Sequence, residues 1–96
     1  MSELVLVSAQ KRPLRPLVEA ALINEARLLE AGICRTEQRL RDLEEKGQMT
    51  TAEFVARYER NELPETLESA EWIGEHRLLV RLREKADILR GIRFAD

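Results

Sequence analysis

The chain has 96 residues, of which 35% are charged, 44% hydrophobic and only 4% aromatic, with four glycines and three prolines. This length predicts a single domain and not a two-domain enzyme, since domains usually contain about 100–200 residues. The charged fraction exceeds the roughly 25% of an ordinary globular protein, and the apolar content is too high for disorder. The composition therefore predicts long helices whose outer faces are solvated.

A net charge of −2 gives the chain no general attraction to nucleic acid or to acidic membranes. The single cysteine, Cys34, forms no disulfide within the chain, and the single histidine, His76, supplies no zinc-binding set. The longest apolar run, over 4–7, falls far short of the about 20 residues that span a bilayer, and it lacks the features of a signal peptide. We therefore expect a cytoplasmic protein with no metal, no cofactor and no membrane partner.

The N-terminal residues 3–8 are apolar and partly β-branched, which predicts a short strand. A lone strand leaves its backbone N–H and C=O groups unpaired, so it needs a second copy of itself or another chain, or it stays frayed. Pro13 and Pro16 close this segment, and Pro16 suits the first turn of a following helix. We divide the chain into a strand and proline-rich linker over 1–16 and a helical hairpin domain over 17–96.

Heptad spacing of apolar residues predicts a first long helix from residue 17 to about residue 46. Its seam consists of Leu22, Ala26, Leu29, Ile33, Thr36, Leu40 and Leu43. Gly47 stands where a residue with positive φ would end the helix. The predicted helix has about 30 residues and a length of roughly 45 Å.

A capping box predicts a second, short helix. Thr50 suits the N-cap, with Glu53 reaching back from the third helical position, while Met49 and Phe54 form a hydrophobic staple. This helix is expected to cover about residues 51–61, since a proline follows.

Pro64 predicts the start of a third helix, over about 65–90, because proline suits the first helical turn. Its heptad seam consists of Trp72, Glu75, Leu79, Leu82, Ala86 and Leu89. Two long helices of matched length, each with one coiled-coil-like seam, predict an all-α antiparallel hairpin with a short connecting helix and an N-terminal β-strand. The alternation of charge supports this fold-back: residues 53–75 carry seven acids against two bases, and residues 76–96 carry six bases against three acids.

Several apolar residues lie off both seams and have no obvious place inside a two-helix hairpin. They are Ile23, Ile73, Val80, Ile88 and Ile92. Single exposed apolar residues are ordinary, but a core of this size rarely supplies more than about 3–5 kcal/mol. We therefore expect a second interface and a homo-oligomer, with a four-helix arrangement across a dimer.

The sequence contains no catalytic constellation, and we predict that the protein is not an enzyme. His76 lies on the charged side of the third helix beside Arg77, and we expect Cys34 to be a semi-buried, inert thiol. Arg77, Arg81 and Lys85 recur at i,i+4 and form a basic stripe. We expect this stripe to pair with acids of the first helix or to be solvated, so that phosphate contacts are the weaker interpretation.

Residues 45–54 (Glu-Lys-Gly-Gln-Met-Thr-Thr-Ala-Glu-Phe) resemble a group of small prokaryotic helical proteins. That group carries a lysine, a short glycine-containing turn, a methionine, Ser/Thr and an acid followed by phenylalanine. Its Gly-Glu-Leu and Phe-x-x-Trp patches have counterparts at 61–63 and 69–72, where Asn61 replaces the glycine and Ser69 the aromatic residue. The group resembles the antitoxin half of two-gene toxin–antitoxin modules, and the likeness extends over roughly residues 17–90. It implies a toxin from the adjacent gene as partner.

We therefore predict a protein–protein interaction module, and the resemblance implies an antitoxin-like subunit that binds and neutralises a partner protein. The predicted contact residues are Leu4, Val5, Leu6, Val7, Phe54, Tyr58 and Trp72. An extended strand can add to the sheet edge of a partner, and aromatic residues concentrate at interface hot spots. The alternative for the three aromatic residues is that they pack together where the short helix folds over the end of the hairpin.

The alternative function is a DNA-binding transcriptional regulator that uses the N-terminal strand and the basic C-terminal helix. In a ribbon–helix–helix dimer, two strands enter the major groove, and their groove-facing residues should be polar. Residues 4–7 are all apolar, which counts against this alternative.

Overall fold

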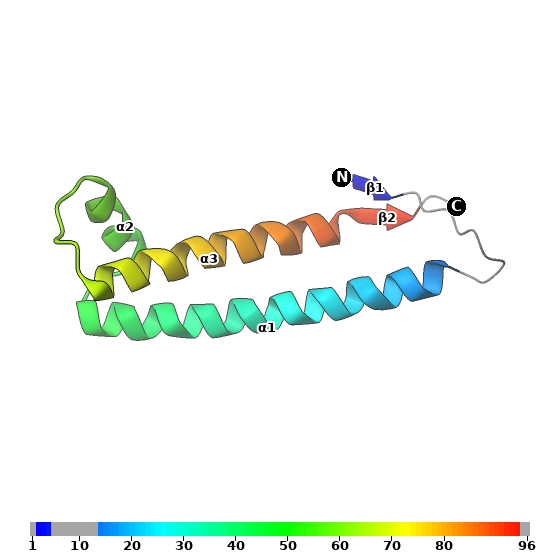
Figure 1. Cartoon of the computed structure of the whole chain (residues 1–96), viewed down its shortest axis with the longest axis horizontal. Coiled ribbons are helices and arrows are strands. Elements are labelled where there is room, and N and C mark those ends of the chain that lie inside the picture. Colours follow the sequence, from blue (N-terminus) through cyan, green and yellow to red (C-terminus); the bar gives the residue numbers. More distant parts are fainter. Residues whose placement is uncertain (1, 5–13, 95–96) are drawn as a thin grey trace.

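The computed structural model describes residues 2–4 and 14–94. Its elements are β1 (Ser2–Leu4), α1 (Arg15–Gly47), α2 (Thr51–Glu59), α3 (Leu67–Arg90) and β2 (Ile92–Phe94). Helices α1 and α3 lie side by side and run in opposite directions, and α2 folds over one end of the pair (Figure 1). The predicted helical hairpin is thus confirmed. We call the end at α2 the closed end, and the end where α1 begins and α3 finishes the open end.

Helix α1 ends one residue later than predicted. Gln48, not Gly47, takes the left-handed conformation, with φ of 54°, and its Nε2 donates to the backbone oxygen of Glu45 (2.6 Å). Gly47 is the last helical residue and meets a different requirement. A Cβ at this position would lie 2.6 and 2.9 Å from two ring carbons of Trp72, so only glycine lets the helix approach the indole this closely.

The predicted N-cap of α2 is confirmed in part. The backbone N–H of Glu53 donates to Thr50 Oγ1 (3.1 Å). The carboxylate of Glu53 accepts from Arg57 Nη2 (2.7 Å), one turn further along the helix. A different acid supplies a cap from α1, because Glu44 Oε2 accepts from the backbone N–H of Thr51 (2.7 Å). The start of α2 is therefore tied to the end of α1.

Helix α3 begins at Leu67, and the prediction of Pro64 in its first turn is wrong. Thr66 is the N-cap and exchanges two hydrogen bonds with Ser69: the backbone N–H of Ser69 donates to Thr66 Oγ1 (3.0 Å), and that of Thr66 donates to Ser69 Oγ (2.8 Å). This reciprocal cap satisfies two helix-end donors at once. The Ser69 hydroxyl is buried, so the capping motif is also part of the packing at the closed end.

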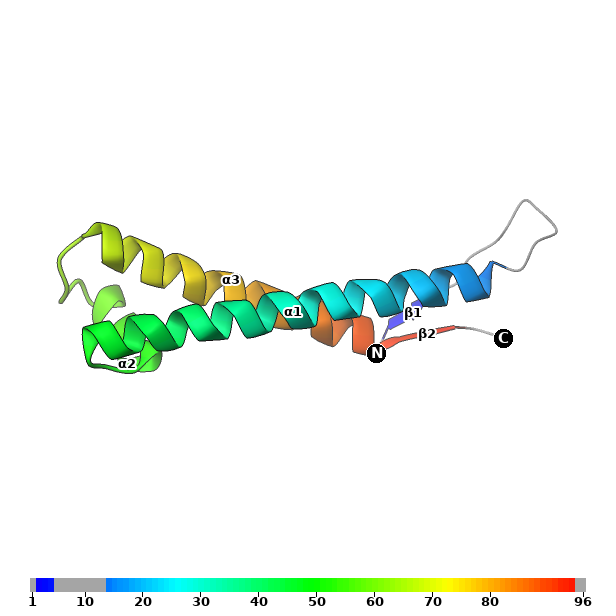
Figure 2. The same cartoon turned by 90° about the horizontal axis from the view of Figure 1, so that it is seen from below.

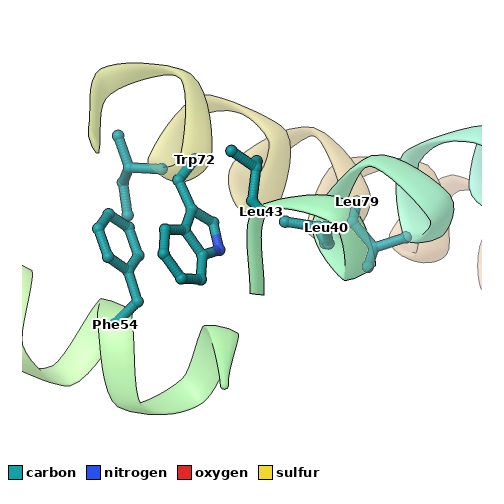
Figure 3. Packing of buried hydrophobic residues seen from close by; sticks show 6 residues of the cluster. Leu40, Leu43, Phe54, Trp72 and Leu79 are labelled. Atoms are coloured by element: carbon teal, nitrogen blue, oxygen red, sulfur yellow. The ribbon is translucent and has the colours of Figure 1, made fainter. Parts of the chain in front are cut away.

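The two predicted seams meet, and most of the buried core lies toward the closed end. Its cluster consists of Leu40, Leu43, Phe54, Trp72, Ile73 and Leu79 (Figure 3). Ile73, which was predicted to lie outside the hairpin core, belongs to this cluster because α2 folds over the closed end. Toward the open end the seam residues Leu22, Leu82, Ala86 and Leu89 are only half-buried, and Ala26 is exposed.

Ser2–Leu4 and Ile92–Phe94 form a two-stranded parallel pair in which Ser2 lies opposite Ile92. The strand predicted over 3–8 was given no partner within the chain, and the segment Ile92–Phe94 was not predicted as a strand. Residues 5–8 lie outside the described residues, so the full predicted strand stays a prediction.

The molecule is an elongated rod with extents of 60 × 22 × 17 Å. Its Cα radius of gyration is 18.9 Å, against about 12–13 Å for a compact domain of this length. Helix α1 continues past the end of α3, so its first turns have no helix opposite them (Figures 1 and 2). Within the described ranges, no helix combines the length and the apolar character that a membrane crossing requires.

Candidate interaction groove at the open end

An apolar groove of about 390 Å³ lies between the two long helices at the open end. Its lining residues are Glu19, Leu22, Ile23, Ala26 and Glu30 from α1, Ala86, Leu89 and Arg90 from α3, and Ile92 from β2. We refer to these nine residues as the open-end groove. Ile23 lines the groove and is 55% exposed.

The groove exists because both seams carry alanine at this end. Ala26 and Ala86 stop at Cβ, whereas Leu40 and Leu79 fill the space between the helices toward the closed end. Helix α3 also finishes at Arg90, while α1 continues beyond it (Figure 1). Small side chains and the early end of α3 therefore leave apolar surface that the hairpin does not cover.

Charged residues border the groove on both sides, with opposite signs. Glu19 and Glu30 lie on the α1 side, and Arg90 lies on the α3 side. Glu19 pairs with Arg15 (2.8 Å), and Arg90 pairs with Asp87, in each case within one helix. The two borders thus differ in sign across an apolar floor, which is the pattern of an interface with an apolar centre and a polar rim.

Of the aromatic residues predicted as partner contacts, Phe54 and Trp72 lie together in the core at the closed end (Figure 3), and Tyr58 is partly buried against that core. The rings of Phe54 and Trp72 stack with centroids 4.2 Å apart and an interplanar angle of 4°, and Tyr58 lies 5.7 Å from Phe54. Trp72 Nε1 donates to Thr51 Oγ1 (3.1 Å). Phe54 and Trp72 are only 2% and 3% exposed, so their rings hold α2 against α3. A partner contact by these residues stays a prediction.

The phenol of Tyr58 donates to Glu65 Oε1 (3.0 Å). This hydrogen bond is the main cause of a pKa of Tyr58 above its ordinary value of 10.0, with smaller contributions from burial and from the charge of Glu65, while Arg77 acts in the opposite direction. The folded state thus favours the protonated phenol. Its contribution to stability is fully present below pH 10 and disappears as the pH rises through the raised pKa.

Replacing Glu65 by alanine is expected to lower the pKa of Tyr58, because it removes both the acceptor and the negative charge. Tyr58 is the only tyrosine, so titration of phenolate absorbance reports on this group alone. Glu62→Ala is the matched control, since the Glu62 carboxylate pairs with Arg60. An equal shift in both variants would contradict the assignment to Glu65.

The strand residues predicted as partner contacts are described only at Leu4, which lies in β1. Val5, Leu6 and Val7 lie outside the described residues, and their role in partner binding stays a prediction.

The two candidate reactive residues lie on different helices. Cys34 is exposed on α1, and the expectation of a semi-buried thiol is wrong. His76 is half-buried on α3, in a shallow hollow that Glu59 and Val80 also line. Across residues 2–4 and 14–94, no group of three or more His, Cys, Asp or Glu side chains is placed to hold a metal ion.

The ion pairs found between the two long helices involve Arg39 and Arg83, which do not belong to the predicted basic stripe. Arg39 Nη1 donates to Glu75 Oε1 (3.1 Å), and Arg83 Nη2 donates to Glu37 Oε2 (2.7 Å). Glu75 is a charged residue of the α3 seam, and its Oε2 is buried with no hydrogen-bond partner among the described residues. The stripe residues themselves, Arg77, Arg81 and Lys85, are exposed on α3.

Part of the groove consists of residues that the sequence pattern predicts to lie at helix contacts. Leu22 and Leu89 lie on the predicted seams, and Ile23 and Ile92 were among the residues assigned to a second interface. Arg90 was missed because no pattern marks a charged residue at the border of a groove. The signal that could have located the groove is alanine at facing seam positions.

No family model, no curated protein and no solved structure matches this chain. The resemblance at residues 45–54 therefore stays a prediction, and a functional proposal depends mainly on the groove.

Proposed function

We propose that this chain is a non-enzymatic protein–protein interaction module whose open-end groove receives a helix of another chain. The observation that supports this proposal is the apolar lining of the groove, which includes the exposed side chain of Ile23. An amphipathic helix can lay its apolar face into such a groove and contact it at i, i+3, i+4 and i+7. Full burial of an exposed isoleucine contributes about 1.5–3 kcal/mol, and covering the 55% of Ile23 that is exposed should supply roughly half of that.

The resemblance at residues 45–54 supports a second, more specific part of the proposal, which concerns the identity of a partner. In this part, the chain is a cytoplasmic antitoxin-like subunit that binds and neutralises a protein from the adjacent gene. The expected contacts of that second partner are Leu4, Val5, Leu6 and Val7, which lie apart from the groove in the sequence.

Affinity capture from the native host tests both parts, with the wild-type chain and two variants as bait. Ile23→Glu places a carboxylate in the groove, and we expect recovery of at least one protein chain to fall about tenfold or more, because burial of an unpaired charge is costly. Leu28→Glu is the matched control: Leu28 is 60% exposed on the same helix but does not line the groove. Its recovery of partners should equal that of the wild type.

Equal recovery of every retained chain by Ile23→Glu and wild type would contradict a role for the groove. A product of the adjacent gene, retained in near-equal amount, would support the antitoxin-like part, and its absence would contradict that part. Recovery of nuclease-sensitive nucleic acid in place of protein would favour the DNA-binding alternative.

A further inference from the structure

We infer that the occupant of the open-end groove is a second copy of this chain, so that two hairpins form a four-helix arrangement at their open ends. This inference rests on the proposed function, because it names the partner of the same groove. In the arrangement, α1 of each copy lies against α3 of the other, and a two-fold axis relates the hairpins.

The exposed area of the chain agrees with the needs of a dimer. The chain exposes 7474 Å², whereas a compact monomer of 11.1 kDa exposes about 5,700 Å². A stable interface buries about 800 Å² per partner, so the excess area is large enough to supply one. The chain is an elongated rod, and its open end has the least buried seam.

Charge complementarity favours a second copy that lies with its α1 against α3 of the first copy. At the open-end groove, α1 contributes the carboxylates of Glu19 and Glu30, and α3 contributes the guanidinium of Arg90. Each hairpin thus offers one acidic and one basic border. A two-fold contact that places α1 against α3 of the second copy brings opposite signs together at both borders, whereas α1 against α1 would oppose like charges.

Two-fold symmetry also explains why one groove is sufficient. An isologous contact uses the same surface on both copies, so each copy must be both the groove and its occupant. The first turns of α1 continue past the end of α3 (Figures 1 and 2), and just after them Leu22 and Ile23 line the open-end groove together with Ala86 and Leu89 of α3. In the dimer these turns lie on α3 of the other copy, beside Ala86 and Leu89.

Sedimentation equilibrium of the purified full chain tests this inference, since no other protein is present. We expect wild type and Leu28→Glu to have twice the chain mass of 11.1 kDa at about 100 µM, and Ile23→Glu to have the mass of one chain. The dissociation constant should rise at least about tenfold in Ile23→Glu. Circular dichroism should show the same helix content in all three chains, because residue 23 lies outside the buried core.

The outcomes separate this inference from the proposed function. A wild-type chain that stays monomeric at about 100 µM overturns the second copy as occupant. If affinity capture then recovers a different protein with wild type and not with Ile23→Glu, the groove remains a protein-binding site. If Ile23→Glu dimerises with the same dissociation constant as the wild type, the two copies do not meet at the groove and the inference is overturned. A monomeric chain that also captures no protein contradicts both.

Discussion

Replacing Trp72 by alanine is expected to lower the free energy of unfolding by about 3–5 kcal/mol, the usual cost of removing a large buried aromatic side chain. Trp72 is the largest residue of the closed-end cluster, stacks on Phe54 and donates to Thr51. Without the indole, α2 loses its main contact with α3. Since small domains have a total stability of about 5–15 kcal/mol, this variant should be close to unfolded at physiological temperature.

Urea denaturation followed by circular dichroism measures this loss, because the substitution removes the only tryptophan and its fluorescence. Trp72→Phe is the matched control: it keeps an aromatic ring for the stack and loses the hydrogen bond to Thr51. A neutral hydrogen bond contributes about 0.5–1.5 kcal/mol, so most of the stability should remain apart from the loss of ring volume. A loss below about 1 kcal/mol in Trp72→Ala would show that the closed end is not the centre of stability.

Replacing Gly47 by alanine is expected to destabilise the protein, although alanine is the better helix former. The gain in helix propensity is at most about 1 kcal/mol. The new methyl group would lie 2.6 Å from a ring carbon of Trp72, and overpacking of this kind costs about 1–3 kcal/mol and sometimes more. The indole is fixed by Phe54 on one side and by Thr51 at its nitrogen, so it has little freedom to retreat.

Gly74→Ala is the control for helix propensity alone. Gly74 is exposed within α3, and a Cβ there would meet no atom within 4 Å. We expect this variant to be more stable than the wild type by about 0.5–1 kcal/mol. The melting temperature should therefore fall in Gly47→Ala and rise in Gly74→Ala. A higher melting temperature for Gly47→Ala would contradict the role of Gly47 in close packing.

The buried core and the proposed binding groove are located at opposite ends of the rod. The closed end holds the stacked rings, the caps of α2 and α3 and most of the buried leucines. The open end carries the half-buried seam and the groove. Substitutions at Ile23 and at Trp72 should therefore have separable effects, the first on association and the second on folding.

Local patterns of residues are sufficient to predict the helices and the faces on which they meet. Heptad spacing predicted both seams, because a repeat of about 3.5 residues keeps one stripe of a helix toward its neighbour. The N-cap at Thr50 was also readable, since a threonine followed three residues later by an acid meets a local hydrogen-bonding need of the backbone. These features depend on residues close together in the chain, and such patterns are visible in one sequence.

Features that depend on residues far apart in the chain could not be predicted from local patterns. Gly47 was interpreted as a turn residue, but its role depends on the ring of Trp72, 25 positions later. Ile73 belongs to the buried cluster at the end of the hairpin that α2 covers, and the groove is lined by the short side chains of Ala26 and Ala86 from the two long helices. No local pattern reports these conditions, since each is set by the distance of closest approach between two elements and by the volume of the side chains between them.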